Sequence, residues 1–105
     1  MELQNIYKQI PDDLSEEVFE CLAQNDNIKI ERIISMGHTS PDSGWHDQEQ
    51  NEWVLLLKGS ASIAFEDEAV VKLGAGDYID IPAHKKHRVT STSSSTETLW
   101  LAIFY

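Results

Sequence analysis

A few polar residues carry the chemistry that the sequence offers. His46, Gln48 and Glu52 lie close together at the start of an apolar run, and His84 and His87 follow further along the chain. In an extended segment, side chains alternate between two faces, so the three even-numbered residues point the same way. Imidazole nitrogens, a carboxylate and an amide oxygen that converge at one place are suitable ligands for a divalent metal ion.

Glu52 is the most informative of these residues. It precedes the apolar run Trp53 to Leu57 and shares its face with Val54 and Leu56. A carboxylate is costly to bury on an apolar face unless it is paired or bound to a metal. The position of Glu52 therefore predicts a partner or a metal ion at the start of this strand.

Short β-rich runs separated by turn residues must position these side chains, and one of the turns is expected at 66–68. The predicted strands are residues 28–35, 52–57, 60–65, 69–73, 78–81, 88–92 and 98–104. Closely spaced strands with tight turns favour an antiparallel sandwich or barrel over alternating strands and helices. We expect an all-β domain, either an antiparallel sandwich or an antiparallel barrel.

A short amphipathic α-helix is predicted before the strands, at residues 11–24. Asp13 and Glu16 are spaced like a capping box, and apolar side chains recur at every fourth position from Leu14. On such a helix Cys21 would pack against the core. The helix would belong to an N-terminal segment of residues 1–26, ahead of the barrel at 28–105.

Length and charge exclude several classes of protein. The 105 residues suffice for one domain, 1–105, and 8 basic against 18 acidic residues give a net charge of −10. This charge disfavours binding to nucleic acids and to anionic membranes. No stretch approaches the roughly 18 apolar residues of a membrane span, the start lacks a signal-peptide pattern, and the single cysteine suits a reducing compartment. We expect a cytoplasmic protein.

Two motifs in the sequence resemble those of the cupins. The first cupin motif is His, any residue, His, three or four residues, Glu, six residues, Gly. It resembles the segment that runs His46-Asp47-Gln48, three residues, Glu52, six residues, Gly59. The second cupin motif is Gly, five residues, Pro, any residue, Gly, two residues, His, three residues, Asn. It resembles the segment that runs Gly76, five residues, Pro82, one residue, His84, two residues, His87. The resemblance implies an antiparallel, jelly-roll-like β-barrel over residues 28–105.

The resemblance also implies a metal site formed by His46, Gln48, Glu52 and His87. Gln48 stands where the family has a second His, and His84 replaces the turn glycine. The set would bind Fe, Mn, Ni or Zn ions with positions left open for a small ligand, and the ion could activate O₂ or polarise a carbonyl oxygen. His84 and Tyr78 are the candidate general bases.

Three basic residues flank His87 in an otherwise acidic chain. Lys85 and Lys86 are either part of a solvated loop, or lie at the mouth of the site and attract an anionic small molecule. Arg88 alternates out of phase with His87 and should point away from the barrel interior.

Three functions are consistent with these residues. The first is a small metal-binding cupin, an enzyme of oxygenase, isomerase or lyase type that acts on a small organic acid or carbonyl compound. The second is a non-catalytic barrel that binds or senses a small molecule, with or without metal. The third is an interaction partner with a vestigial site. Because the segments 52–57 and 98–104 are apolar on both faces, we also expect a homodimer.

Overall fold

Eight β-strands make up the regular structure in residues 1–66 and 68–105, which this computed structural model describes. The strands are β1 (Val18–Gln24), β2 (Lys29–Ser35), β3 (Glu52–Lys58), β4 (Ser60–Phe65), β5 (Val71–Gly74), β6 (Tyr78–Ile81), β7 (His87–Thr92) and β8 (Thr98–Phe104). The seven predicted strands are confirmed as β2 to β8. Asp67, in the turn predicted at 66–68, lies outside the described residues.

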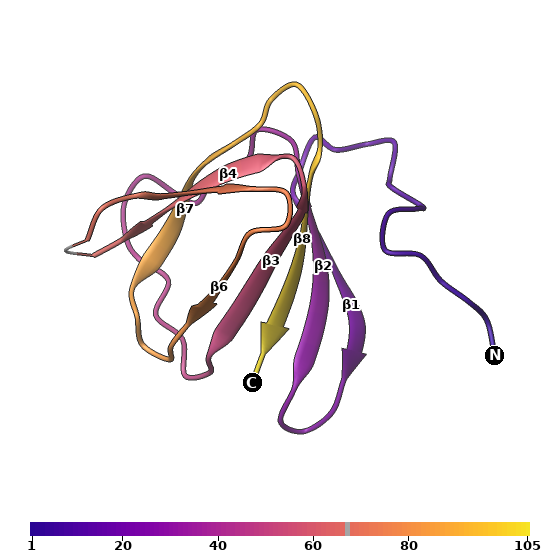
Figure 1. The fold of residues 1–105 in the computed structure, drawn as a ribbon, viewed down its shortest axis with the longest axis horizontal. Coiled ribbons are helices and arrows are strands. Elements are labelled where there is room, and N and C mark those ends of the chain that lie inside the picture. Colours follow the sequence, from indigo (N-terminus) through magenta and orange to yellow (C-terminus); the bar gives the residue numbers. More distant parts are fainter. Residues whose placement is uncertain (67) are drawn as a thin grey trace.

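The strands form two antiparallel sheets that enclose an apolar core (Figure 1). The large sheet has the order β1-β2-β8-β3-β6, and the small sheet has the order β5-β4-β7. Within the described residues the hydrogen-bonded pairing stops at β1 and β6 in one sheet and at β5 and β7 in the other. The prediction of a closed barrel is therefore corrected to a pair of facing sheets.

The predicted helix at residues 11–24 is wrong, and none of the described residues is helical. Asp13 accepts a hydrogen bond from the Ser15 N–H at 2.9 Å, which makes a local turn instead of a helix cap. The second half of the segment is β1, which pairs with β2 and hydrogen-bonds the backbone groups along the free edge of that strand. Because β1 is an edge strand, Cys21 is exposed and does not pack in the core.

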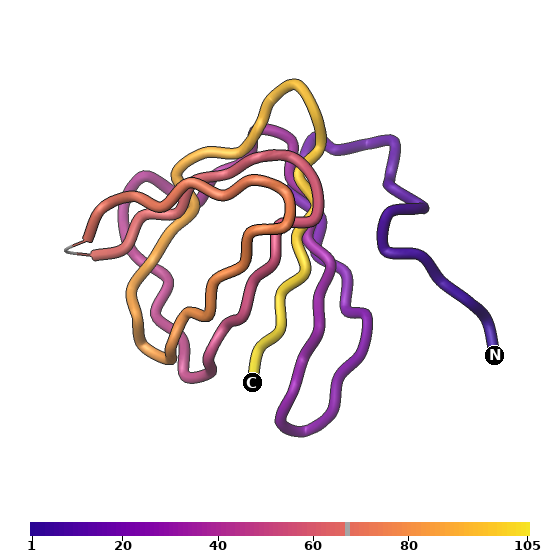
Figure 2. Tube along the Cα trace, in the orientation of Figure 1, coloured from indigo at the N-terminus to yellow at the C-terminus, as the bar shows by residue number. Residues whose placement is uncertain are grey.

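Arg32 anchors the N-terminal segment to the sheet. The residue is 5% exposed, and its guanidinium donates to the carbonyl oxygens of Ile6, Lys8 and Gln9 at 2.6 to 3.2 Å. It also bonds the Glu20 carboxylate, which lies opposite Arg32 in the β1–β2 register. Figure 2 shows the anchored segment as the indigo trace beyond β1.

Apolar side chains lie on both faces of the large sheet. Val54 and Leu56 are buried in the core between the sheets. On the outer face Trp53 packs against Tyr78, with ring centroids 5.3 Å apart, and Tyr78 is 66% exposed. This half-covered outer face is the surface on which the sequence predicts contact with a second copy. Among the described residues, no helix of the length and apolar character of a membrane span occurs.

Gly59 lets the chain pass from one sheet to the other within a single residue. It lies between β3 and β4 and has a φ of +95°, a backbone conformation that residues with a Cβ rarely adopt. A Cβ placed there would lie 2.5 Å from Thr98 Oγ1 and 2.8 Å from Thr98 Cα. The first motif therefore ends in glycine for reasons of both conformation and space.

Gly59→Ala should destabilise the fold by about 2 to 4 kcal/mol, because it adds overpacking against β8 to the strain of a positive φ. Urea denaturation of the purified protein measures this change. Gly44→Ala is the control: its φ is +88° but a Cβ would meet nothing within 4 Å, so only about 1 kcal/mol of strain is expected. Equal costs at the two positions would contradict the close approach to Thr98.

Arg32→Met should destabilise the protein by about 3 kcal/mol, because it removes a buried cation and leaves its partners without a donor. It should also make residues 1–17 more sensitive to limited proteolysis. Glu20→Gln is the matched control, since it keeps the three bonds to carbonyl oxygens and should cost about 1 kcal/mol. If both variants unfold at the same urea concentration, Arg32 does not anchor the segment.

Candidate metal centre

A pair of backbone hydrogen bonds holds His46 and His87 side by side. The His46 N–H donates to the His87 carbonyl at 2.8 Å, and the His87 N–H donates to the His46 carbonyl at 3.2 Å. His87 is the first residue of β7, whereas His46 lies in the loop before β3 and joins β7 through this isolated bridge. The two imidazole centroids are 5.8 Å apart. The bridge thus fixes the positions of two imidazoles that are distant in sequence.

Glu52 and Gln48 meet His87 inside the molecule. Gln48 Nε2 donates to Glu52 Oε1 at 2.7 Å, and His87 Nε2 lies 3.1 Å from the same oxygen. Glu52 is the first residue of β3, and the register places it between Ile81 of β6 and Phe104 of β8. The carboxylate that the sequence predicts to need a partner therefore has two.

The orientation of the His87 ring is set by its backbone neighbour. The Nδ1–H donates a hydrogen bond to the carbonyl oxygen of Lys85 at 2.8 Å, so Nε2 is the nitrogen that faces Glu52. Burial disfavours the protonated, charged form of the ring and so lowers its pKa. The hydrogen bonds to Glu52 and Lys85, together with the attraction of the Glu52 charge, favour the protonated form and outweigh the effect of burial. The pKa of His87 is therefore raised above its usual value of 6.5.

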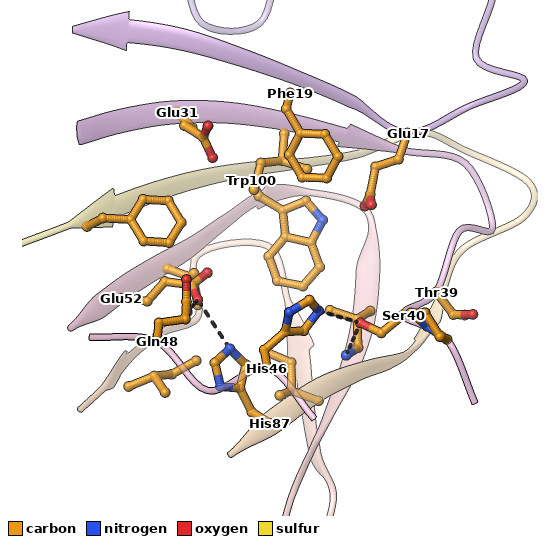
Figure 3. A pocket seen from close by; sticks show the side chains of 17 residues that line it. Glu17, Phe19, Glu31, Thr39, Ser40, His46, Gln48, Glu52, His87 and Trp100 are labelled. Atoms are coloured by element: carbon orange, nitrogen blue, oxygen red, sulfur yellow. Dashed lines mark hydrogen bonds and ion pairs between the residues drawn. The ribbon is translucent and has the colours of Figure 1, made fainter. Parts of the chain in front are cut away.

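His46 faces a different partner. Its Nε2 lies 3.3 Å from the Ser40 hydroxyl, and Figure 3 shows this pair on one side of the His87–Glu52 pair. Within the described part of the chain, no three His, Cys, Asp or Glu side chains are grouped closely enough to hold a metal ion. The donors share one cavity, but as they stand His46 is hydrogen-bonded away from Glu52.

The cavity in which these side chains meet has a volume of about 320 Å³. That volume is typical of small-molecule sites. Its walls combine aromatic and aliphatic side chains from both sheets with the four predicted ligands and two further carboxylates, Glu17 and Glu31. None of the described residues that line it is Lys or Arg.

The two candidate bases lie outside this cavity. His84 has a φ of 64°, which turns its side chain outward, where Nδ1 contacts Asp47 Oδ1 at 2.8 Å and the side chain is 65% exposed. Tyr78 lies on the outer face of β6 beside Trp53. Neither side chain lines the cavity, so neither is placed to move a proton there.

The basic residues beside His87 also lie away from the cavity. Lys85 Nζ is 3.1 Å from Glu68, and Lys86 Nζ is 3.9 Å from Glu66. These side chains line a separate surface hollow together with His84. The structure therefore does not place Lys85 or Lys86 at the mouth of the cavity.

Sequence reasoning missed much of the cavity wall, including Glu17, Phe19, Glu31 and Trp100. A signal existed for Glu31, because it alternates in phase with Ile33 on the predicted strand. There was no such signal for Glu17 and Phe19, since both fall in the segment predicted as a helix. Trp100 follows the inward phase of Ala102 on β8.

Comparisons with known proteins agree on the family. A cupin-domain family model matches residues 32–104. A protein from Ralstonia eutropha, provisionally described as a mannose-6-phosphate isomerase, is 38% identical, with a TM-score of 0.94 over 99% of this chain and 97% of that one. No curated protein matches in sequence.

Two more distant structures share the fold. An RmlC-like cupin from Methanocaldococcus jannaschii, with a double-stranded β-helix fold, is 16% identical, with a TM-score of 0.71 over 91% of this chain and 85% of that one. A polyketide cyclase from Streptomyces resistomycificus is also 16% identical, with a TM-score of 0.75 over 99% of this chain and 78% of that one.

Glu52→Gln should lower the pKa of His87, because the change removes the charge that raises it and leaves the burial that opposes it. Titration of the His87 ring protons by NMR, in metal-free protein, measures the shift. Glu66→Gln, on the exposed loop near Lys86, is the control and should leave the titration unchanged. A His87 pKa that stays constant in Glu52→Gln would show that the two side chains do not interact in solution.

Proposed function

The chain belongs to the cupin family, and we propose that it binds a divalent metal ion and a small organic molecule together in the cavity between its sheets. His46, Gln48, Glu52 and His87 would hold the ion. The apolar remainder of the cavity would hold the organic molecule.

One observation carries the proposal: polar side chains converge in a cavity that is otherwise largely apolar. His87 presents Nε2 to Glu52 because its Nδ1 is bound by the Lys85 carbonyl. A backbone carbonyl on the far nitrogen is the arrangement that orients a metal-ligating histidine. Gln48 donates to the same carboxylate oxygen, so Gln48 and His87 both contact Glu52.

The donors fit a divalent ion in their chemistry. Two imidazoles, one carboxylate and one amide oxygen suit Fe, Mn, Ni or Zn ions. When bound, such an ion would supply a Lewis acid with open positions for a small ligand. A metal-dependent oxygenase, isomerase or lyase reaction could use such positions.

The protein's own residues have two tasks in this proposal. Glu52 and the Lys85 carbonyl hold His87 in one orientation, and the backbone bridge holds His46 beside it. Val54 and Ile81 line the cavity behind them and are 3% and 2% exposed. These apolar walls exclude water and strengthen the electrostatic interactions inside.

The charge of the cavity bears on the kind of ligand. A sugar phosphate, such as the name of the Ralstonia eutropha relative implies for that protein, calls for cationic groups near its phosphate. The described residues that line this cavity include neither Lys nor Arg. We therefore favour a ligand without a phosphate group for this chain.

A metal-free binding cavity is the second candidate. The polar side chains have hydrogen-bond partners even without an ion. Gln48 and His87 bond Glu52, and His46 bonds Ser40. The same cavity would then bind a small molecule through these groups alone.

Titration of metal-free wild type with Mn(II), Ni(II) and Zn(II) by calorimetry distinguishes the two candidates. We expect binding of one ion per chain, weakened more than about 100-fold in Glu52→Gln, which keeps the shape but loses the charged ligand. Binding should weaken as the pH falls through the raised pKa of His87, because the proton on Nε2 competes with the ion.

Glu31→Gln is the matched control, because Glu31 lines the same cavity without belonging to the ligand set. It should bind the metal nearly as tightly as wild type. Absence of binding of all three ions to wild type would overturn the metal centre in favour of the metal-free candidate. Equal losses in the two variants would show that the ion does not sit on the proposed ligands.

A further inference from the structure

The wall of the cavity that faces the metal ligands has its own chemical character. Figure 3 shows Glu31, Phe19 and Glu17 on one side of the view, the four predicted ligands on the other side, and the Trp100 ring between them. Phe19 is 59% exposed although it lines the cavity. A ligand that packed against it would cover this apolar side chain.

The strand register explains how Glu31 comes to lie among aromatic rings. Glu31 of β2 pairs with Ala102 of β8, whose small side chain leaves space above the sheet. Its diagonal neighbours on the same face of β8 are Trp100 and Phe104, at a separation that aromatic side chains can bridge. Both rings line the cavity. The register thus sets one carboxylate between two aromatic side chains.

Carboxylates outnumber cationic side chains in the wall of the cavity, although Lys29 pairs with Glu31 from outside the lining and His87 lies beside Glu52. Glu17, Glu31 and Glu52 line it, and the described lining residues include no Lys or Arg. If Glu52 is used by a divalent ion, the two other carboxylates remain on the opposite wall. Glu17 accepts a hydrogen bond from the Ser35 hydroxyl at 2.5 Å, which orients it but leaves its charge.

The protein itself shows that Glu31 binds an ammonium group. Lys29 Nζ lies 2.9 Å from Glu31 Oε2, with the Lys29 side chain 46% exposed and the Glu31 side chain 11% exposed. Lys29 projects from the same face of β2, two residues away, and its partner in the register is Phe104. Lys29 is the more exposed partner of this pair and does not line the cavity, so a cationic ligand would compete with it for Glu31.

We propose that the small molecule bound in this cavity carries an alkyl-substituted ammonium group, which packs against Trp100 and Phe104 beside Glu31. Aromatic faces attract such cations, and a nearby carboxylate adds to the attraction. The other end of the molecule reaches the polar side chains around Glu52. The inference deepens the proposed function and rests on its claim that the cavity binds a small organic molecule.

Choline and its neutral isostere 3,3-dimethyl-1-butanol provide the test, because they differ in charge and hardly in shape. Binding to the 105-residue chain is followed by NMR through the indole N–H signals of its three tryptophans. We expect choline to bind about tenfold more tightly than the alcohol, and to shift the signal of Trp100 more than those of Trp45 and Trp53. Equal affinities, or shifts centred on another tryptophan, would overturn the proposal.

Two substitutions on β2 should act in opposite directions. Glu31→Gln should remove most of the preference for choline, because the carboxylate becomes a neutral amide of the same shape. Lys29→Gln should tighten choline binding, because it removes the competing ammonium group from Glu31. Unchanged preference in both variants would contradict the placement of the cation beside Glu31.

Metal titration of the same proteins separates this inference from the proposed metal centre. Glu52→Gln should lose the metal and keep the preference for choline, whereas Glu31→Gln should keep the metal and lose the preference. Wild type that binds metal but does not distinguish choline from the alcohol would overturn the ammonium subsite alone. Wild type that prefers choline but binds none of the three ions would support the subsite and overturn the metal centre alone.

Discussion

Two backbone hydrogen bonds between His46 and His87 join the loop before β3 to the first residue of β7. They bring a segment that belongs to neither sheet against the small sheet, at the edge of the cavity. Together with the bonds between Ser40 and Val89 and the bond from the His84 N–H to the Gln48 carbonyl, they fix the loop relative to Glu52. The large sheet positions Glu52 through β6 and β8. The arrangement of polar groups in the cavity therefore depends on a contact made by main-chain atoms.

The cavity contains polar groups whose burial would be costly without partners. The Glu52 carboxylate is bonded by Gln48 and His87, and His87 is bonded in turn by the Lys85 carbonyl. Such a network is stable only when each member is satisfied. A bound ion would replace bonds among these side chains with bonds to itself, which is how a site of this kind can exist both with and without metal. Glu31 lies outside this network, among aromatic side chains.

Local pattern was sufficient for much of the fold and for part of the site. The alternation around Glu52 predicted its strand and its inward direction. The spacing of the two motifs predicted that His46, Gln48 and His87 share one site, and all three line the same cavity. The helix at residues 11–24 was wrong because spacing by four cannot reveal that β2 needs an edge partner. His84 could not be placed either, since its positive φ depends on the turn after Pro82. Glu31 shows an inward phase, but its aromatic neighbours come from β8 and are set by the register between distant strands.

The most direct test of the metal centre is an anomalous difference map from crystals grown with Mn(II). We predict one strong peak in the cavity, in contact with ligand atoms of His46, Gln48, Glu52 and His87, with the bond between His46 and Ser40 broken. A cavity without a peak, in which Gln48 and His87 still bond Glu52, would contradict it.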